Sequence, residues 1–242
     1  GEEPAAWKVV PQLPFELATL PRTLFRWLRL PVVSYAIPAL ISVGIVRHHR
    51  AAGASRIVRG LRRARERKAM QILAEMQPET GGYLEAPPLN SFVAICLSAA
   101  GYKEHPVTEN CVRFLLDSRR VDGSWAIDTN LAVWVTTQAV KAFAASSNHP
   151  PVLSTPQKKR ICDWLLGCQY TGRNPYSGAD AGGWAWTYKQ GGVPDADDTA
   201  GALIALHSLA GSQRVVTQKA VNGLRWLSAI QNSDGGIPTF CR

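Results

Sequence analysis

Several patterns typical of metal sites and disulfide frameworks are missing from this sequence. Its five cysteines follow no CxxC spacing, and its five histidines show no spacing of metal ligands. We therefore expect buried thiols in a reducing compartment, no metal site and no cofactor. The cysteines are Cys96, Cys111, Cys162, Cys168 and Cys241.

Features of targeting and of membrane spans are scarce as well. The uncharged stretch at residues 31–46 is too short to cross a bilayer, and Pro31 and Pro38 interrupt it. We expect it to form a buried core helix. Glu2 and Glu3 stand where a signal peptide carries basic residues, so we expect no cleavable targeting sequence.

Acidic residues are outnumbered, with 18 Asp and Glu against 27 Lys and Arg, and the basic excess gathers at residues 47–68. Nucleic-acid phosphates, anionic lipid headgroups and plain solvation all accept such a cluster. No aromatic residues are interleaved with the arginines, and no nucleic-acid motif is visible. We expect no nucleic-acid partner, which leaves a solvated helix face or, as the functional interpretation, contact with a membrane surface.

What the sequence does contain is enough apolar material, 46% of 242 residues, for one or two domains with a sizeable core. From residue 68 onward, amphipathic helical patterns alternate with glycine turns, and no credible alternating strand is found. The units recur at a spacing of about 40 to 60 residues, as in stacked helical hairpins. The pattern predicts an all-α repeat fold.

Residues 182–200, GGWAWTYKQGGVPDADDTA, combine aromatic rings, glycines and three carboxylates. Pro194 and Asp195 predict a helix start, with Asp195 as N-cap and Asp198 in the position of a capping-box acid. This structural role accounts for two acids and leaves Asp197 over. Because three carboxylates repel one another, burial against the tryptophans would keep one of them protonated at neutral pH, which makes it a proton donor.

This segment resembles the active-site segment of the squalene–hopene cyclases and related class II terpene cyclases, whose signature is Asp-x-Asp-Asp-Thr-Ala. The resemblance implies that Asp197 protonates a terminal alkene of squalene or a related polyprenyl chain, supported by Asp195 and Asp198. An alkene is a very weak base, so its acid must be undissociated and dry. The resulting carbocations are stabilised by aromatic faces.

The same resemblance implies a set of aromatic residues that bind the substrate. Trp184 and Trp186 would line the cavity, with Tyr188 as a further aromatic of that segment. Trp134 falls where the cyclases carry an active-site tryptophan. An ordinary core tryptophan remains an equal alternative for that position.

The family's fold is an α/α toroid of paired helices, which this chain would contain in incomplete form. Its helical units resemble QW repeats, in which a glutamine near a helix end and a downstream aromatic tie helices together, as Gln169 and Trp184 would do. Residues 1–130 would be the end of a first helical barrel with a basic, membrane-proximal segment. Residues 131–242 would be the start of the catalytic barrel.

Two functions from different classes follow. The first is an intramolecular cyclising isomerase of squalene–hopene cyclase type, which takes an apolar polyprenyl substrate and lies as a monotopic protein on the cytoplasmic side of a membrane. The second is a non-catalytic helical-repeat scaffold, or a fragment that needs a missing C-terminal half. A homodimer is left open. A third possibility, Mg²⁺ and diphosphate chemistry, is disfavoured because Asp197 and Asp198 would point to different sides of a helix.

Overall fold

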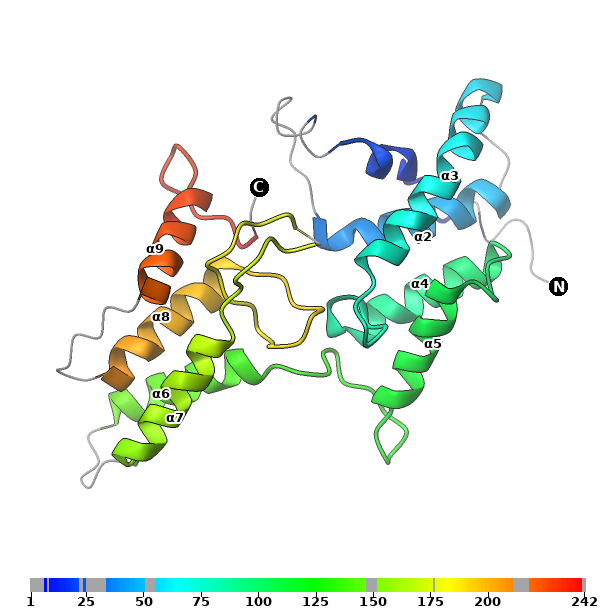
Figure 1. The fold of residues 1–242 in the computed structure, drawn as a ribbon. Helices are drawn as coiled ribbons and strands as arrows, with labels where there is room; N and C mark the ends of the chain where they lie inside the picture. The colour runs from blue at the N-terminus through cyan, green and yellow to red at the C-terminus, as the bar shows by residue number, and fades with distance from the viewer. Residues whose placement is uncertain are drawn as a thin grey trace. The chain divides into compact units, whose positions relative to one another are not determined.

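The computed structural model describes residues 7, 9–21, 24, 34–50, 55–146, 152–175, 177–210 and 218–240. Within these ranges the regular structure is helical (Figure 1), and extended backbone pairs only at isolated bridges of Asp195 with Trp184 and with Phe240. The predicted all-α fold class is confirmed. Among the described residues, no helix is both long and apolar enough to cross a membrane.

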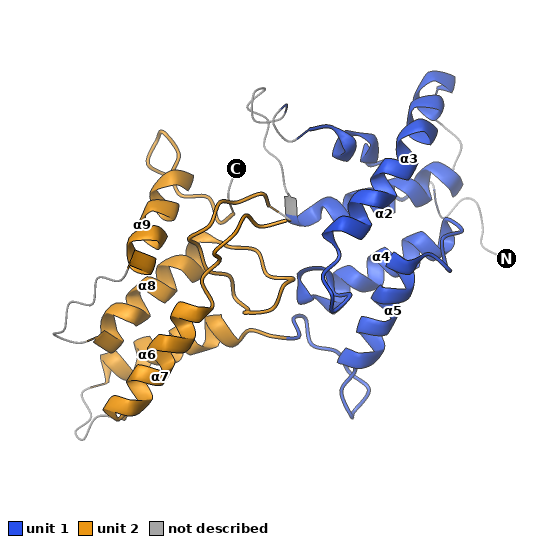
Figure 2. Ribbon diagram, viewed as in Figure 1, with its two compact units in different colours: residues 1–129 blue, residues 130–242 orange. Residues whose placement is uncertain are grey.

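The chain divides into two compact units, Gly1–Thr129 and Asn130–Arg242 (Figure 2). Each contains helices that pack on one another and bury an apolar core. The assignment of residues 1–130 and 131–242 to the end of one barrel and the start of another stays a prediction.

Unit 1 is built around α2, α4 and α5. The core helix expected at residues 31–46 is confirmed for its described part, because Ile41, Ile45 and Val46 of α2 are fully buried and α2 packs against α4. Prolines at the first turns of α4 and α5 suit a position where a backbone N–H would lack an intrahelical partner. The elements are η2 (Phe15–Thr19), η3 (Ser34–Ala36), α2 (Ile37–Arg50), α3 (Arg56–Met76), η4 (Tyr83–Glu85), α4 (Pro87–Ala99) and α5 (Pro106–Ser118).

The basic run forms the end of α2 and most of α3. Ser55 caps α3 by accepting a hydrogen bond from the Val58 N–H. Arg62 is buried and forms an ion pair with Glu16 at 3.2 Å. The other arginines of the helix are exposed, and in the described ranges their side chains make no ion pair or hydrogen bond: Arg56, Arg59, Arg63, Arg65 and Arg67.

Unit 2 has two helices, α6 and α8, that pack side by side, with α7 and α9 packed against α8. Its core contains Val133, Leu165 and Trp184, all fully buried. Ser154 and Gln157 form a capping box at the start of α7. The elements are α6 (Ala132–Ala145), α7 (Thr155–Gly167), α8 (Ala196–Ala210) and α9 (Gln218–Ile230).

The four described cysteines are free thiols, as the sequence predicts. Cys96 and Cys111 are buried, whereas Cys162 and Cys168 are partly buried. Burial raises the pKa of the Cys111 thiol to about 12, so it stays protonated at neutral pH. Cys241 lies outside the described residues.

Glutamines at helix ends make the same hydrogen bond at three turns. The amide Nε2 of each donates to the carbonyl of a following glycine, Gln77 to Gly81, Gln169 to Gly182 and Gln231 to Gly235, at 2.7 to 3.0 Å. All three glycines have φ between +81° and +124°, which non-glycine residues rarely adopt. Gln77 and Gln169 also donate to carbonyls near the starts of α5 and α9, at Val107 and Lys219. Each of these two glutamines therefore links three segments.

Aromatic donors bond to the preceding helix at two of these turns and at a further turn around Gly123. The Tyr83 hydroxyl and the indole N–H groups of Trp125 and Trp184 donate to carbonyls of the preceding helices at 2.7 to 2.8 Å. The accepting residues are Leu73, Leu115 and Leu165. Such bonds give a second donor to carbonyl groups near a helix C-terminus. Tyr83 makes this bond where Trp125 and Trp184 make it in later turns, and the assignment of these turns to QW repeats stays a prediction.

Replacing Gln169 with Ala tests this turn. We expect the free energy of unfolding to fall by about 1–3 kcal/mol, because two carbonyl groups lose a donor that is 6% exposed. Gln231→Ala is the matched control, since the exposed Gln231 makes the equivalent bond to Gly235 only. Urea unfolding of both variants measures the difference. Equal losses would show that the second bond, to Lys219, contributes nothing.

Candidate active site

The start of α8 is organised by Asp195, which acts as the predicted N-cap. Its Oδ1 accepts from the Asp198 N–H at 2.7 Å, and its carbonyl accepts from the Thr199 N–H at 3.1 Å. The capping box expected from Asp198 is not formed, because the Asp195 N–H donates to the Trp184 carbonyl instead. A hydrogen bond to the extended segment before α8 therefore replaces the second hydrogen bond of a capping box, from the N-cap N–H to the acid.

Thr199 fastens the same segment to α8. Its Oγ1, fully buried, accepts from the Trp184 N–H at 2.9 Å and contacts the Trp184 carbonyl at 3.3 Å. The sequence motif contains this threonine, but we had assigned it no role. The first acid and the tryptophan are thus held together by Thr199.

The three carboxylates differ sharply in their environments. Asp195 and Asp198 are 4% and 5% exposed, whereas Asp197 is exposed to solvent. Burial, followed by the charge and hydrogen bonding of Asp198, raises the pKa of Asp195 to about 9. Burial also raises the pKa of Asp198, whose buried Oδ1 has no hydrogen-bond partner among the residues that the structure describes. The buried pair therefore retains a proton at neutral pH.

This proton makes stability depend on pH. The pKa of Asp195 in the folded chain, about 9, lies above the ordinary value of 3.8, so between these values the folded state binds more protons than the unfolded state. The stability from this group is fully present below pH 3.8 and is lost as pH rises toward 9. We expect the melting temperature to fall over this window.

The melting temperature of Asp195→Asn should fall less steeply with rising pH, because the asparagine cannot titrate and its Oδ1 can still accept from the Asp198 N–H. Asp197→Asn is the control, since the side chain it changes is exposed. Melting temperatures at a series of pH values measure both slopes. If Asp195→Asn keeps the slope of the unmodified chain, the proton does not reside on this pair.

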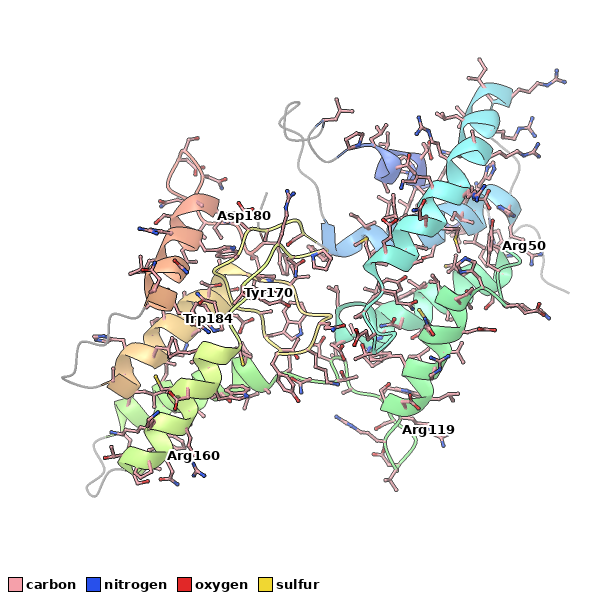
Figure 3. All side chains as sticks on the ribbon, viewed as in Figure 1. Arg50, Arg119, Arg160, Tyr170, Asp180 and Trp184 are labelled. Atoms are coloured by element: carbon pink, nitrogen blue, oxygen red, sulfur yellow. The ribbon has the colours of Figure 1, made fainter. Side chains whose placement is uncertain are left out.

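The structure places Trp184 in the core of unit 2, near Tyr170 (Figure 3). It is 0% exposed, and its indole N–H donates to the Leu165 carbonyl at 2.7 Å. The ring also lies against Gly223, where an added Cβ would come within 2.8 Å of it. In this unit Trp184 has a structural position and presents no surface to a ligand, which argues against the predicted contact with substrate.

The other predicted aromatics are accessible. Trp134 and Tyr188 are 45% and 57% exposed. Trp186 is half-buried, and its indole N–H finds no partner within the described part of the chain. For Trp134 the alternative of a core tryptophan is therefore disfavoured in this unit. The Tyr188 ring contacts the ring of Trp164 edge-on, with 6.3 Å between the ring centroids.

Trp134 and Asp197 lie at the same end of two parallel helices. The N–H groups of Val133 and Trp134, in the first turn of α6, donate to the Trp186 carbonyl, and the Asp195 N–H before α8 donates to the Trp184 carbonyl. These bonds attach the starts of α6 and α8 to the same extended segment, and the two helices also pack together (Figure 1). The accessible acid and an accessible indole ring are brought to one end of unit 2.

Asn130 is a residue of this region that the sequence analysis did not single out. Its Oδ1 accepts from the Ala132 N–H at 3.2 Å and from the Thr187 hydroxyl at 2.8 Å. It thus satisfies the first N–H of α6 from the position before the N-cap residue, Leu131, and fixes the segment that carries Trp186. Asparagine is a residue type that marks helix starts, and it could have been recognised.

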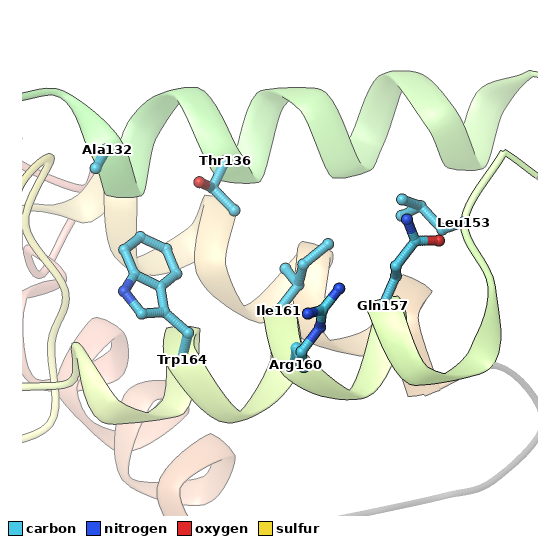
Figure 4. Close-up of a pocket in the computed structure, with 7 residues that line it drawn as sticks. All are labelled: Ala132, Thr136, Leu153, Gln157, Arg160, Ile161 and Trp164. Carbon is cyan, nitrogen blue, oxygen red and sulfur yellow. The ribbon is translucent and has the colours of Figure 1, made fainter.

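A cavity of about 440 Å³ lies between α6 and α7 (Figure 4). Trp164 and Ile161 project from α7 toward Thr136 and Ala132 of α6. None of the three aspartates lines it. Trp164, which lines it, contacts the ring of Tyr188 in the predicted site.

Comparisons with known proteins agree with this architecture. Residues 130–242 match the family model described as the squalene–hopene cyclase C-terminal domain. A squalene–hopene cyclase of Alicyclobacillus acidocaldarius is 27% identical over 190 residues, which cover 74% of this chain and 29% of that protein. Dammaradiene synthase of Dryopteris crassirhizoma is 30% identical over 185 residues, 72% of this chain and 26% of that protein.

A terpene cyclase–glycosyl transferase fusion protein of Humicola fuscoatra is 29% identical over 199 residues, 74% of this chain and 14% of that protein. The chain thus spans less than a third of the length of these relatives. Its all-helical hairpins are consistent with the α/α toroid of the family. Residues 130–242 of the chain therefore match the C-terminal domain of the squalene–hopene cyclases, and these three relatives are a squalene–hopene cyclase, a dammaradiene synthase and a terpene cyclase fusion protein by name.

Proposed function

We propose that the complete protein protonates a terminal alkene of squalene or a related polyprenyl chain and so starts a cyclisation. The observation that carries this proposal is the unequal carboxylate trio at the start of α8. Asp195 and Asp198 form a buried pair with raised pKa values, and Asp197 beside them is exposed. A site that keeps an undissociated carboxyl next to an accessible one suits the transfer of a proton to a weak base.

In the proposed mechanism Asp197 donates its proton to the alkene, because it is the accessible member of the trio. The proton bonds to one alkene carbon, and the other carbon becomes a cation that the next double bond attacks. Loss of a proton or addition of water ends the series. The retained proton on the Asp195 and Asp198 pair limits the negative charge beside Asp197, and covering Asp197 in the complete protein would exclude water from it.

Aromatic faces would stabilise the cations. The exposed ring of Trp134 lies at the same end of the helix pair as Asp197, and Trp186 and Tyr188 follow from the connected segment. Cation–π attraction is stronger where water is excluded. We leave Trp184 out of this set because its ring is fully buried in the core.

A non-catalytic scaffold is the alternative that a specific observation favours. Asp195 caps α8, and Trp184 and Thr199 hold the preceding segment, so much of the motif has a structural role. This alternative leaves Asp197 without one, since its side chain is exposed and does not cap the helix. The presence or absence of cyclic products separates the two functions.

The test is incubation of the complete protein with squalene and with other polyprenyl chains, with and without EDTA. We expect cyclic products in both cases, because a carboxyl supplies the proton. Among the described residues, no group of three His, Cys, Asp or Glu side chains is placed to hold a metal ion. Abolition by EDTA with rescue by Mg²⁺ would overturn the protonation mechanism, and no product under either condition would favour the scaffold.

We also propose that the protein lies on a membrane surface, on the cytoplasmic side, and draws its apolar substrate from it. Ile57 and Leu61 of α3 are 84% and 48% exposed among the unpaired arginines of that helix. Exposed apolar side chains beside basic ones suit an anionic interface. Co-sedimentation with anionic liposomes tests this, and failure to pellet at low salt would leave a solvated basic face.

A further inference from the structure

A second cavity, of about 510 Å³, lies in unit 1 beside α3. Arg63 and Arg67 line it from α3, and Tyr102 and His105 line it from the connection between α4 and α5. Glu66 is the acidic residue among those that line it. The charge that this cavity presents to a ligand depends on which of these groups already form hydrogen bonds or ion pairs within the chain.

Glu66 is engaged by neighbours and is buried. Its Oε1 accepts from His49 Nε2 at 2.7 Å and from the Tyr102 hydroxyl at 2.6 Å. Burial, together with the bond to Glu66, raises the pKa of Tyr102 to about 12, so its hydroxyl stays protonated and keeps donating. The Glu66 carboxylate is therefore engaged by these two donors. Among the described residues, it forms no ion pair with Arg63 or Arg67.

The arginines remain available. Arg63 and Arg67 are exposed, lie one turn apart on the same face of α3, and have no hydrogen bond or ion pair within the described part of the chain. Like charges at this spacing repel each other, so a bound anion would relieve the repulsion. Arg63 is also one of the charges that, after burial, lower the pKa of His48 nearby, as expected where positive charge is in excess.

His105 supplies a third donor with a defined tautomer. Its Nδ1 accepts from the Val107 N–H at 3.2 Å at the start of α5. Because Nδ1 acts as an acceptor, the neutral ring carries its proton on Nε2. No partner for Nε2 is found among the described residues, and His105 lines the cavity.

We propose that this cavity binds a phosphoryl group. Two guanidinium groups provide planar pairs of N–H donors, which match phosphate oxygens, and the imidazole N–H supplies a further donor from the connection between α4 and α5. The group comes either from a soluble phosphate compound or from a phospholipid headgroup. The site belongs to unit 1 and does not depend on the cyclisation proposed for the acids of α8.

The first arm of the test is titration of the protein with inorganic diphosphate by calorimetry. We expect saturable binding that weakens about tenfold or more in the double variant Arg63→Gln/Arg67→Gln, because charge-assisted bonds are lost. The control is Arg113→Gln/Arg119→Gln, which removes the same charge from exposed residues of unit 1 that do not line the cavity. It should retain the affinity. Melting temperatures confirm that both variants are folded.

The second arm is co-sedimentation with vesicles of phosphatidylcholine containing phosphatidic acid. If the source is a lipid headgroup, binding falls more in the Arg63/Arg67 variant than in the control, whether or not diphosphate binds. Selective loss of diphosphate binding alone identifies a soluble ligand. If neither probe distinguishes the two variants, or neither binds the unmodified protein, the site does not exist and α3 carries only diffuse charge.

Discussion

Replacing Asp197 with Asn in the complete protein is expected to abolish cyclisation while leaving the fold intact. Asn keeps the volume of the side chain but removes the acidic proton. General acid catalysis contributes roughly 10²–10⁴ in rate, and no solvent acid replaces it in a dry cavity. The melting temperature should hold or rise, because Asp197 is exposed and a negative charge beside Asp198 is removed. Product formation and melting temperature are measured on the same preparation.

Asp195→Ala is the contrasting variant. Loss of its bond to the Asp198 N–H should cost about 1 kcal/mol of stability through the missing cap. Under the scaffold alternative, Asp195→Ala still loses this stability and Asp197→Asn is nearly silent. Full activity in Asp197→Asn would remove Asp197 from the proposed mechanism.

Replacing Trp184 with Ala is expected to have the largest effect on stability. The ring is fully buried among α6, α7 and α8, and its N–H satisfies the Leu165 carbonyl. Truncation of a buried tryptophan typically costs about 3–5 kcal/mol. Denaturant unfolding of the variant measures this loss.

Trp184→Phe is the matched control, because it keeps most of the apolar ring and removes the N–H donor. We expect it to cost about 0.5–1.5 kcal/mol, the net contribution of one hydrogen bond, because the Leu165 carbonyl still accepts from the Cys168 N–H. If Trp184 bound substrate from a cavity wall instead, both variants would alter activity with losses in stability well below these values. That outcome would contradict its position in the core.

Local sequence patterns predicted most of the fold. The apolar period of α2, the glycine turns and the helix start at Asp195 were each expected from neighbouring residues, and each is confirmed. Capping and helical periodicity depend on residues within a few positions of each other, which the sequence shows directly. The regular recurrence of Gln77 and Gln169 before glycines likewise marked the turns.

The site was harder to predict because it depends on contacts distant in sequence. The Asp195 N–H could have bonded Asp198 or, as found, the Trp184 carbonyl eleven positions earlier. An aromatic residue after two glycines can seal a core or line a cavity, and only the packing of α6 to α8 places Trp184 in the core. The split between the buried pair and the exposed Asp197 follows from the same packing.

The central proposal is that a carboxyl proton of this site is transferred to an alkene carbon. Incubation of the complete protein with squalene in deuterium oxide tests it most directly, because carboxyl protons exchange with solvent. We predict a cyclic product with one deuterium on the carbon that was the terminal alkene position, and none of this product from Asp197→Asn. Cyclic product without deuterium at that carbon would contradict protonation as the first step.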